Sequence, residues 1–267
     1  MMNRRRIFAF IGAAVVSMLL AIGASLLIPS ISTLVAQSNT TLLVSTAASL
    51  KDAMEEIKTN YQQSQSGVRI NFNFGASGAL LQQIQQGAPV DIFISAAKKQ
   101  VDTLEQAGKL VPGTRGILAK NRLVLIVPRN STGVTSFFDL SKDNIRKIAI
   151  GEPRSVPAGQ YAEQVLQKLK IYDKLKSKFV YANNVRQVLA AVESGNADAG
   201  LVYRTDAAIS NKVKTVVAAS ETYHSPIVYP MAVLKQSKNV KAATEFVQYL
   251  SSEQAKGVFN KYGFILP

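Results

Sequence analysis

The stretch "VRINFNFGASGALL" at residues 68–81 runs from a polar and apolar alternation, through a glycine-flanked serine, into a helical pattern. The alternation predicts a β-strand, and Leu80, Leu81 and Ile84 recur at helical spacing. A strand that enters a helix through such a turn is typical of α/β proteins. The turn around Ser77 fits either a simple connection or an anion-binding loop, and taken alone it leaves both open.

The same alternation of short strands and amphipathic helices continues along the chain. We expect strands at residues 41–45, 68–74, 91–95, 122–128, 147–150, 179–182, 200–203, 213–217 and 227–234. Strands separated by helices predict mostly parallel sheets that are covered on both faces. The tail at residues 240–262 is expected to form a helix that breaks near Ser251-Ser252.

The first 36 residues are expected to form an export signal. Arg4-Arg5-Arg6 precedes an apolar run at residues 7–28, and Leu34-Val35-Ala36 offers a small-residue cleavage site. The run is also long enough for an uncleaved membrane anchor, because a span needs about 20 apolar residues. We therefore expect a periplasmic protein, with anchoring as the alternative.

Composition narrows the class of protein. The chain of 267 residues has no cysteine, which excludes disulfides and thiol chemistry, and its net charge is +14. The basic residues are scattered rather than clustered with aromatic residues, so we expect no nucleic-acid partner. The charge favours solubility and mild attraction of an anionic ligand.

Four predicted helix starts share one kind of chemistry. They lie at Ser49, Ser77, Ala158 and Val185, each at the start of a predicted helix that follows a predicted strand in the chain. Ser49-x-x-Asp52 has the spacing of a capping box. Helix starts present unpaired N–H groups and the positive end of the helix dipole, and in open α/β sheets they gather at one edge. Together they predict a cleft for a small, fully ionised oxyanion.

Each residue also has an ordinary structural explanation. Ser49 alone fits a helix cap, Ala158 and Val185 fit packing positions, and Tyr203 fits a core tyrosine. The joint pattern, rather than any one residue, favours a binding site.

Several motifs together resemble the periplasmic molybdate-binding proteins of ABC transporters. The matching segments are "TAASL" at 46–50, "FGASGALLQQIQQGAPVDIFISA" at 74–96, "VPAGQYA" at 156–162, "NNVRQVLAAVESGNADAGLVYRTDA" at 183–207 and "YGF" at 262–264. The resemblance runs from about residue 41 to the end and implies a two-lobed type II periplasmic-binding-protein fold. Lobe 1 would be residues 41–122 plus 227–267, and lobe 2 would be residues 123–226.

The resemblance also implies the site and its partners. Molybdate, and tungstate with it, would be held by Ser49, Ser77, Ala158, Val185 and Tyr203. Molybdenum would be bound as the oxyanion, with no direct metal ligand from the protein and no cofactor. The protein would be a monomer that delivers its ligand to a membrane permease. Where family members often have a serine-rich turn, this chain has Gly75-Ala-Ser-Gly78, whose glycines would let the backbone approach the anion.

Carboxylates near the helix starts bear on the choice of oxyanion. None follows Ser77, Ala158 or Val185 directly, which suits a ligand without a proton to donate. Asp52, Glu152 and Asp206 nevertheless lie close by in sequence.

Two alternatives remain at this stage. The first is a binding protein for another oxyanion, such as sulfate or phosphate. The second is a secreted serine hydrolase that uses Ser49 or Ser77, although His224 is the one histidine of the chain and no G-x-S-x-G motif occurs. We therefore expect a binding protein and not an enzyme.

Overall fold

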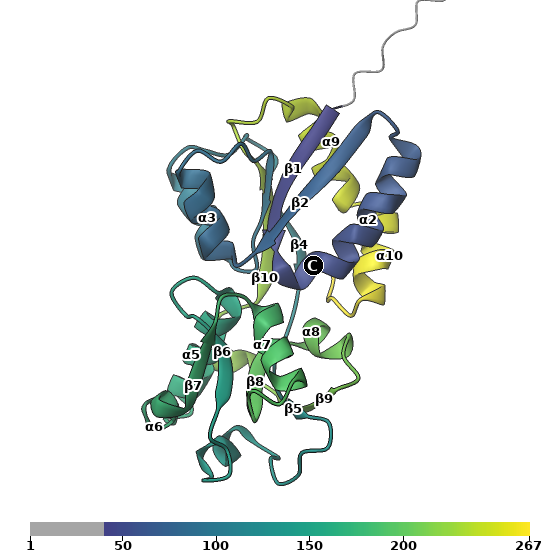
Figure 1. Cartoon of the computed structure of the whole chain (residues 1–267). Helices are drawn as coiled ribbons and strands as arrows, with labels where there is room; N and C mark the ends of the chain where they lie inside the picture. Colours follow the sequence, from purple (N-terminus) through teal and green to yellow (C-terminus); the bar gives the residue numbers. More distant parts are fainter. Residues whose placement is uncertain (1–39) are drawn as a thin grey trace, which may run out of the picture. The chain divides into compact units, whose positions relative to one another are not determined.

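Figure 1 shows the computed structural model of the protein, which describes residues 40–267. The export signal or anchor expected at residues 1–36 lies outside the described residues. Within residues 40–267, no helix is long and apolar enough to cross a membrane. By its internal contacts, Asn39–Pro267 forms one compact unit.

The first sheet has five strands in the order β2-β1-β3-β10-β4. Their bounds are β1 Thr40–Ala47, β2 Val68–Gly75, β3 Ile92–Ile94, β4 Gly116–Lys120 and β10 Val228–Val233. β1 pairs in parallel with β2 and β3, whereas β10 is antiparallel to β3 and β4. All residues of β10 are buried, so this reversed strand belongs to the centre of the sheet.

The second sheet repeats this arrangement, in the order β7-β6-β8-β5-β9. Its strands are β5 Leu123–Pro128, β6 Ile148–Gly151, β7 Phe179–Ala182, β8 Ala199–Tyr203 and β9 Val213–Ala218. β6 is parallel to β7 and β8, and β5 is antiparallel to β8 and β9. Each sheet thus has one reversed strand, and in each it is the strand that the chain enters on crossing from the other sheet.

Helices cover the sheets with apolar faces. Their bounds are α2 Lys51–Ser64, α3 Ser77–Gln85, α4 Lys98–Gln106, α5 Pro157–Lys168, α6 Tyr172–Leu175, α7 Val185–Glu193, α8 Arg204–Ala208, α9 Val240–Leu250 and α10 Glu253–Lys261. Short 3-10 turns are η2 Ala48–Leu50, η3 Phe137–Ser141, η4 Lys176–Lys178 and η5 Glu221–Tyr223. On α2 the buried residues are Ala53, Met54, Ile57 and Tyr61, which is the face that helical spacing predicts.

The two-lobed α/β fold is confirmed, with two details that the sequence did not predict. The strand β4 was missed, because it is short and glycine-led and its partner strand, β10, is distant in sequence. The sheets are also less parallel than expected, since β5 and β10 run against their neighbours. The helix break near Ser251-Ser252 is confirmed, because α9 ends at Leu250 and α10 begins at Glu253.

Two crossing segments join the sheets, one at residues 121–122 and the other at residues 219–227. They lie side by side, because the N–H of Asn121 donates to the carbonyl of Ile227 at 3.1 Å. We propose the lobe boundaries at these crossings: lobe 1 is residues 41–122 plus 227–267, and lobe 2 is residues 123–226. This division is a prediction, supported by the strands that each sheet contains.

Candidate anion-binding site

One small cavity is lined by all five residues that the sequence singled out. Its volume is about 10 Å³, measured as the space open to the centre of a water-sized sphere. The five are Ser49 after β1, Ser77 after β2, Ala158 after β6, Val185 after β7 and Tyr203 at the end of β8. All are buried. Because β1 is parallel to β2 and β6 is parallel to β7, the carboxyl ends of each pair point to the same edge. The assignment of these residues as molybdate contacts stays a prediction.

Backbone donors surround the cavity. Ser77 and Val185 are the first residues of α3 and α7, and Ala158 is the second residue of α5. N–H groups in a first helical turn have no acceptor within the helix, and they carry the positive end of the helix dipole. The described residues that line the cavity include no charged side chain. The site therefore attracts an anion through dipoles and hydrogen-bond donors.

The hydroxyl of Ser77 is already oriented by the protein. The N–H of Ala96 donates to Ser77 Oγ at 2.9 Å, deep in the core. Since that hydroxyl accepts from the backbone, its own proton is available to a ligand in the cavity.

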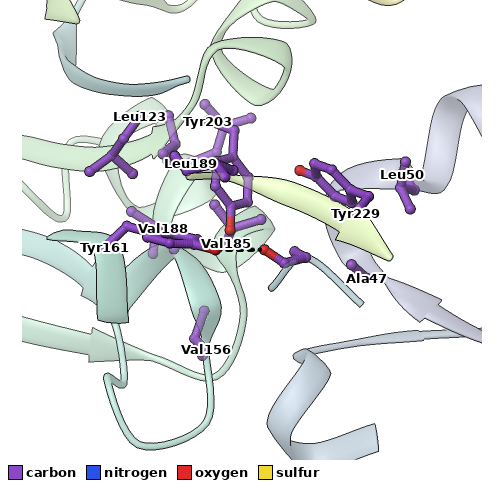
Figure 2. Packing of buried hydrophobic residues seen from close by; sticks show 14 of the residues in the cluster. Ala47, Leu50, Leu123, Val156, Tyr161, Val185, Val188, Leu189, Tyr203 and Tyr229 are labelled. Atoms are coloured by element: carbon purple, nitrogen blue, oxygen red, sulfur yellow. Dashed lines mark hydrogen bonds between the residues drawn. The ribbon is translucent and has the colours of Figure 1, made fainter. Parts of the chain in front are cut away.

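Tyr203 is buried beside Tyr161 and Tyr229. Figure 2 shows Tyr203 between these two rings and close to Val185. The Tyr203 hydroxyl has no hydrogen-bond partner among the described residues, although a buried hydroxyl normally has one. Burial raises the pKa of Tyr203 well above its usual value, so the phenol keeps its proton. It can therefore donate that proton to a ligand.

Contacts between the proposed lobes close around the cavity. The N–H of Gly78, at the start of α3, donates to the carbonyl of Ser155 at 2.9 Å. The Tyr161 hydroxyl donates to the carbonyl of Ala96 at 3.3 Å. The expectation that both glycines of the turn let the backbone approach an anion is thus wrong for Gly78. Gly75 lines the cavity, whereas Gly78 lets the two lobes approach one another.

A cluster of ion pairs lies next to the cavity, and of its three side chains only Asp206 is fully buried. Arg186, which follows Val185, places Nη2 2.6 Å from Asp52 of α2 and Nε 2.6 Å from Asp206 of α8. Arg186 Nη2 also donates to the carbonyl of Ser49 at 3.3 Å. Arg186 thereby links the two proposed lobes.

Asp206 is fully buried, and its contact with Arg186 is close but poorly aligned for a hydrogen bond. Burial raises the pKa of Asp206 to about 6, although Arg186 acts in the opposite direction. The cost of desolvating the carboxylate therefore exceeds the gain from its pairing with the guanidinium.

The carboxylates near the helix starts do not line the cavity. Asp52 and Asp206 pair with Arg186, and Glu152 pairs with the exposed Arg154. The expected capping box at Ser49 and Asp52 is wrong, because no side chain caps α2 and the Ser49 hydroxyl bonds to Tyr229 instead. Distant partners have displaced the local hydrogen bonds of the box.

Sequence reasoning missed Arg186, Tyr229 and Asn121. Arg186 is next to a predicted donor, which is a weak signal, but its partner Asp52 lies 134 residues away. Asn121 lies in one crossing segment and Tyr229 near the start of β10, and their side chains bond to each other across 108 residues. Only the fold brings these residues to the site.

The arrangement of His224 does not support the serine hydrolase that was considered from the sequence. The Nδ1 atom of His224 lies 2.8 Å from the carbonyl of its neighbour Ser225. His224 packs against Tyr161 and shares no hydrogen bond with Ser49 or Ser77 in the described part of the chain. Residues 40–267 contain no group of three or more His, Asp or Glu side chains placed to hold a metal ion.

The chain is similar to known proteins over a range of residues that includes both sheets. Residues 42–265 match the protein family described as bacterial extracellular solute-binding protein. The chain is 48% identical to a putative ABC transporter substrate-binding lipoprotein, YvgL, of Bacillus subtilis, over 85% of this chain and 87% of that relative. It is 38% identical to the molybdate-binding protein ModA of Haemophilus influenzae, over 82% of this chain and 87% of the relative.

A solved structure gives a similar result. The substrate-binding domain of a putative molybdenum ABC transporter from Clostridium difficile is 48% identical, with a TM-score of 0.67. The likeness covers 85% of this chain and 99% of that domain.

Proposed function

Because the chain belongs to the family of bacterial extracellular solute-binding proteins, we propose that it captures molybdate outside the cytoplasm and delivers it to an ABC permease. The observation that carries the proposal is the one cavity shared by Ser49, Ser77, Ala158, Val185 and Tyr203. The molybdate-binding relative supports the choice of ligand. Tungstate, which has the same charge and tetrahedral form, is expected to bind as well.

The chemistry of the cavity suits a fully ionised oxyanion. Such a ligand accepts hydrogen bonds on every oxygen and donates none. Two serine hydroxyls, one phenol and backbone N–H groups of helix starts are available as donors. Hydrogen bonds to a charged group contribute about 1.5–3 kcal/mol each, so five or six of them reach the roughly 8–12 kcal/mol of micromolar to nanomolar binding.

Binding is expected to accompany closure of the lobes. Donors from Ser49 and Ser77 belong to lobe 1, and those from Ala158, Val185 and Tyr203 belong to lobe 2. A ligand that bonds to both lobes favours the closed form, and the permease would then recognise that form.

The family assignment also answers the question of catalysis. Members of this family bind solutes, and the prediction that the protein is not an enzyme is confirmed on that ground. We propose that it acts as a monomer without a cofactor, with the anion as cargo.

The family supports a location outside the cytoplasm. We propose that residues 1–36 direct export and are removed, which leaves a free periplasmic protein. Mass spectrometry of exported material tests this directly. A start near Gln37 is expected, whereas an intact N-terminus in the membrane fraction would indicate an anchor.

The ligand is tested by titrating the purified chain, starting at Gln37, with molybdate, tungstate, sulfate and phosphate while its melting temperature is recorded. Molybdate and tungstate are expected to raise the melting temperature most, because a ligand that binds the native state stabilises it by mass action. Equal stabilisation by sulfate or phosphate would reject the ligand proposed here. Ser77→Ala should abolish most of the shift, while the exposed Ser194→Ala serves as the control.

A further inference from the structure

A chain of three hydrogen-bonded side chains ends at the cavity. Asn121 Nδ2 lies 3.1 Å from the Tyr229 hydroxyl, and that hydroxyl lies 2.9 Å from Ser49 Oγ. Tyr229 is completely buried, and Ser49 and Asn121 are almost so. Of the three, only Ser49 lines the cavity.

The orientation of the Asn121 amide is fixed by its neighbours. The backbone N–H of Arg122 points at the side-chain oxygen of Asn121 at 2.9 Å, and an N–H requires an acceptor. The amide nitrogen must therefore face the other two partners, Tyr229 and the hydroxyl of Thr205 at 2.9 Å. An amide nitrogen only donates, so both of its protons are used.

This orientation decides which group donates in each hydrogen bond from Asn121 through Tyr229 to Ser49. The Tyr229 oxygen accepts from Asn121, and its single proton has one remaining partner in the described structure, Ser49 Oγ. If Ser49 donated instead, the phenol proton would be buried without an acceptor, which is costly. Ser49 Oγ therefore accepts from Tyr229, and its own proton is left for the cavity.

We propose that Asn121 and Tyr229 are positioning residues that make the Ser49 hydroxyl a fixed hydrogen-bond donor, and so tune the site to oxygens that carry no proton. The inference rests on the proposed function, because it concerns the same anion. Ser77 is oriented by the same logic through the N–H of Ala96. A protonated oxyanion such as hydrogen phosphate would present its proton to hydroxyls that are set to donate.

The first test is a double-mutant cycle. Tyr229→Phe removes the phenol but keeps the ring contacts with Tyr203 and Phe264. We expect molybdate affinity to fall about 5- to 20-fold, as for weakening one hydrogen bond to a charged group. In a Ser49→Ala background, the same change should have less than a twofold effect, because Tyr229 acts through Ser49.

The ratio of molybdate affinity to phosphate affinity is a second measurement. It should not change if Tyr229 only stabilised the fold. Without the phenol, Ser49 is free to accept, so the affinity ratio of molybdate to phosphate should fall in Tyr229→Phe. Tyr262→Phe is the matched control, since it removes a hydrogen-bonded phenol, 2.9 Å from Glu56, that does not line the cavity. It should leave both the affinity and the ratio unchanged.

A second double-mutant cycle reverses the donor and acceptor roles in the hydrogen bonds between Asn121, Tyr229 and Ser49. Asn121→Asp keeps an acceptor for the N–H of Arg122 but puts a carboxylate oxygen in place of the amide nitrogen that faces Tyr229. The phenol then donates to this carboxylate oxygen, and Ser49 turns its proton toward Tyr229 and away from the cavity. Comparing Asn121→Asp with and without Tyr229→Phe removes the direct effect of the added charge on the anion, because both backgrounds carry it. We expect the loss of molybdate affinity to be at least threefold larger when the phenol is present.

The outcomes separate this inference from the proposed function. If the wild-type chain bound none of the oxyanions, the proposed function would fail, and this inference with it. If molybdate bound but the effects of Tyr229→Phe and Ser49→Ala were additive, only the inference would be overturned. Preferential binding of phosphate by the wild type would also overturn it, because a site of fixed donors disfavours a protonated ligand.

Discussion

Tyr203 carries a buried hydroxyl with no partner in the described structure. Removing this hydroxyl is therefore not expected to lower the free energy of unfolding. Tyr203→Phe removes an unsatisfied polar atom, so the free protein should be equally stable or up to about 1 kcal/mol more stable. Molybdate affinity should fall by about 10-fold or more, because the ligand loses a donor. Urea unfolding and calorimetric titration measure the two effects.

Tyr249→Phe is the control for this substitution. Its hydroxyl is likewise buried and unpartnered among the described residues, but Tyr249 belongs to α9 and does not line the cavity. Its affinity should equal that of the wild type. Equal losses of affinity in both variants would contradict the role given to Tyr203.

Asp206 makes stability depend on pH in a defined direction. Its folded-state pKa of about 6 lies above its ordinary value of 3.8. The folded state therefore holds the proton more tightly, and the stabilising contribution is complete below about pH 4 and is lost as the pH rises through 6. Asp206→Asn should remove this dependence, which we expect to be about 1–3 kcal/mol between pH 4 and pH 7. Urea unfolding at both pH values checks the difference, and an unchanged slope would refute it.

At the scale of elements, the start of α3 controls how closely the lobes approach. A Cβ added to Gly78 would lie 2.6 Å from the carbonyl oxygen of Ser155. Gly78→Ala should therefore weaken molybdate binding about 10-fold or more by hindering closure. The free protein should be no less stable, because alanine favours a helix over glycine by about 0.5–1 kcal/mol.

Gly257→Ala is the matched control, since Gly257 lies within α10 and its added Cβ would meet nothing within 4 Å. This variant should gain similar helix stability and keep full affinity. Small-angle scattering with molybdate should show Gly78→Ala remaining more open than the control. Full closure of Gly78→Ala would contradict the role assigned to this glycine.

The elements also show what local sequence determines. Strands such as β2 and helices such as α7 were predictable, because alternation and helical spacing are properties of neighbouring residues. The pairing of β10 with β3 and β4 was not, because nothing within β10 specifies its partners or its direction. The short β4 owes its strand conformation to that distant pairing, so its own residues gave no signal.

At the scale of the whole molecule, Arg186 holds the proposed lobes together. Asp52→Asn removes the cross-lobe charge pair but leaves Arg186 its buried partner Asp206. We expect molybdate affinity to fall about two- to fivefold, mainly through faster release, because partly exposed pairs contribute about 1 kcal/mol or less. Stopped-flow measurement of release tests this.

Glu55→Gln is the control for the charge change. Glu55 pairs with Lys58 within the same helix, α2, and does not reach lobe 2. Release from this variant should match the wild type. If both variants released the anion equally fast, the effect would belong to the charge of α2 and not to the link between lobes.

The site also contains some residues that neighbouring sequence suggests and others that only the fold brings there. Ser49 and Ser77 were candidates from the sequence, because a serine between a strand and a helix fits an anion-binding turn as well as a simple cap. Ala158 and Val185 line the cavity but offer no side-chain donor, so only the joint pattern and the resemblance could single them out. Tyr229 reaches Ser49 across 180 residues, so its place in the site follows from the fold alone.

The position of β10 also has a consequence for the order of folding. β10 pairs with both β3 and β4 and is the last strand along the described chain, so the first sheet stays split until the C-terminal segment arrives. Every strand of the second sheet lies within residues 123–218. As the chain emerges during translocation, we expect the second lobe to fold first. The edges of β3 and β4 would stay exposed until β10 pairs with them.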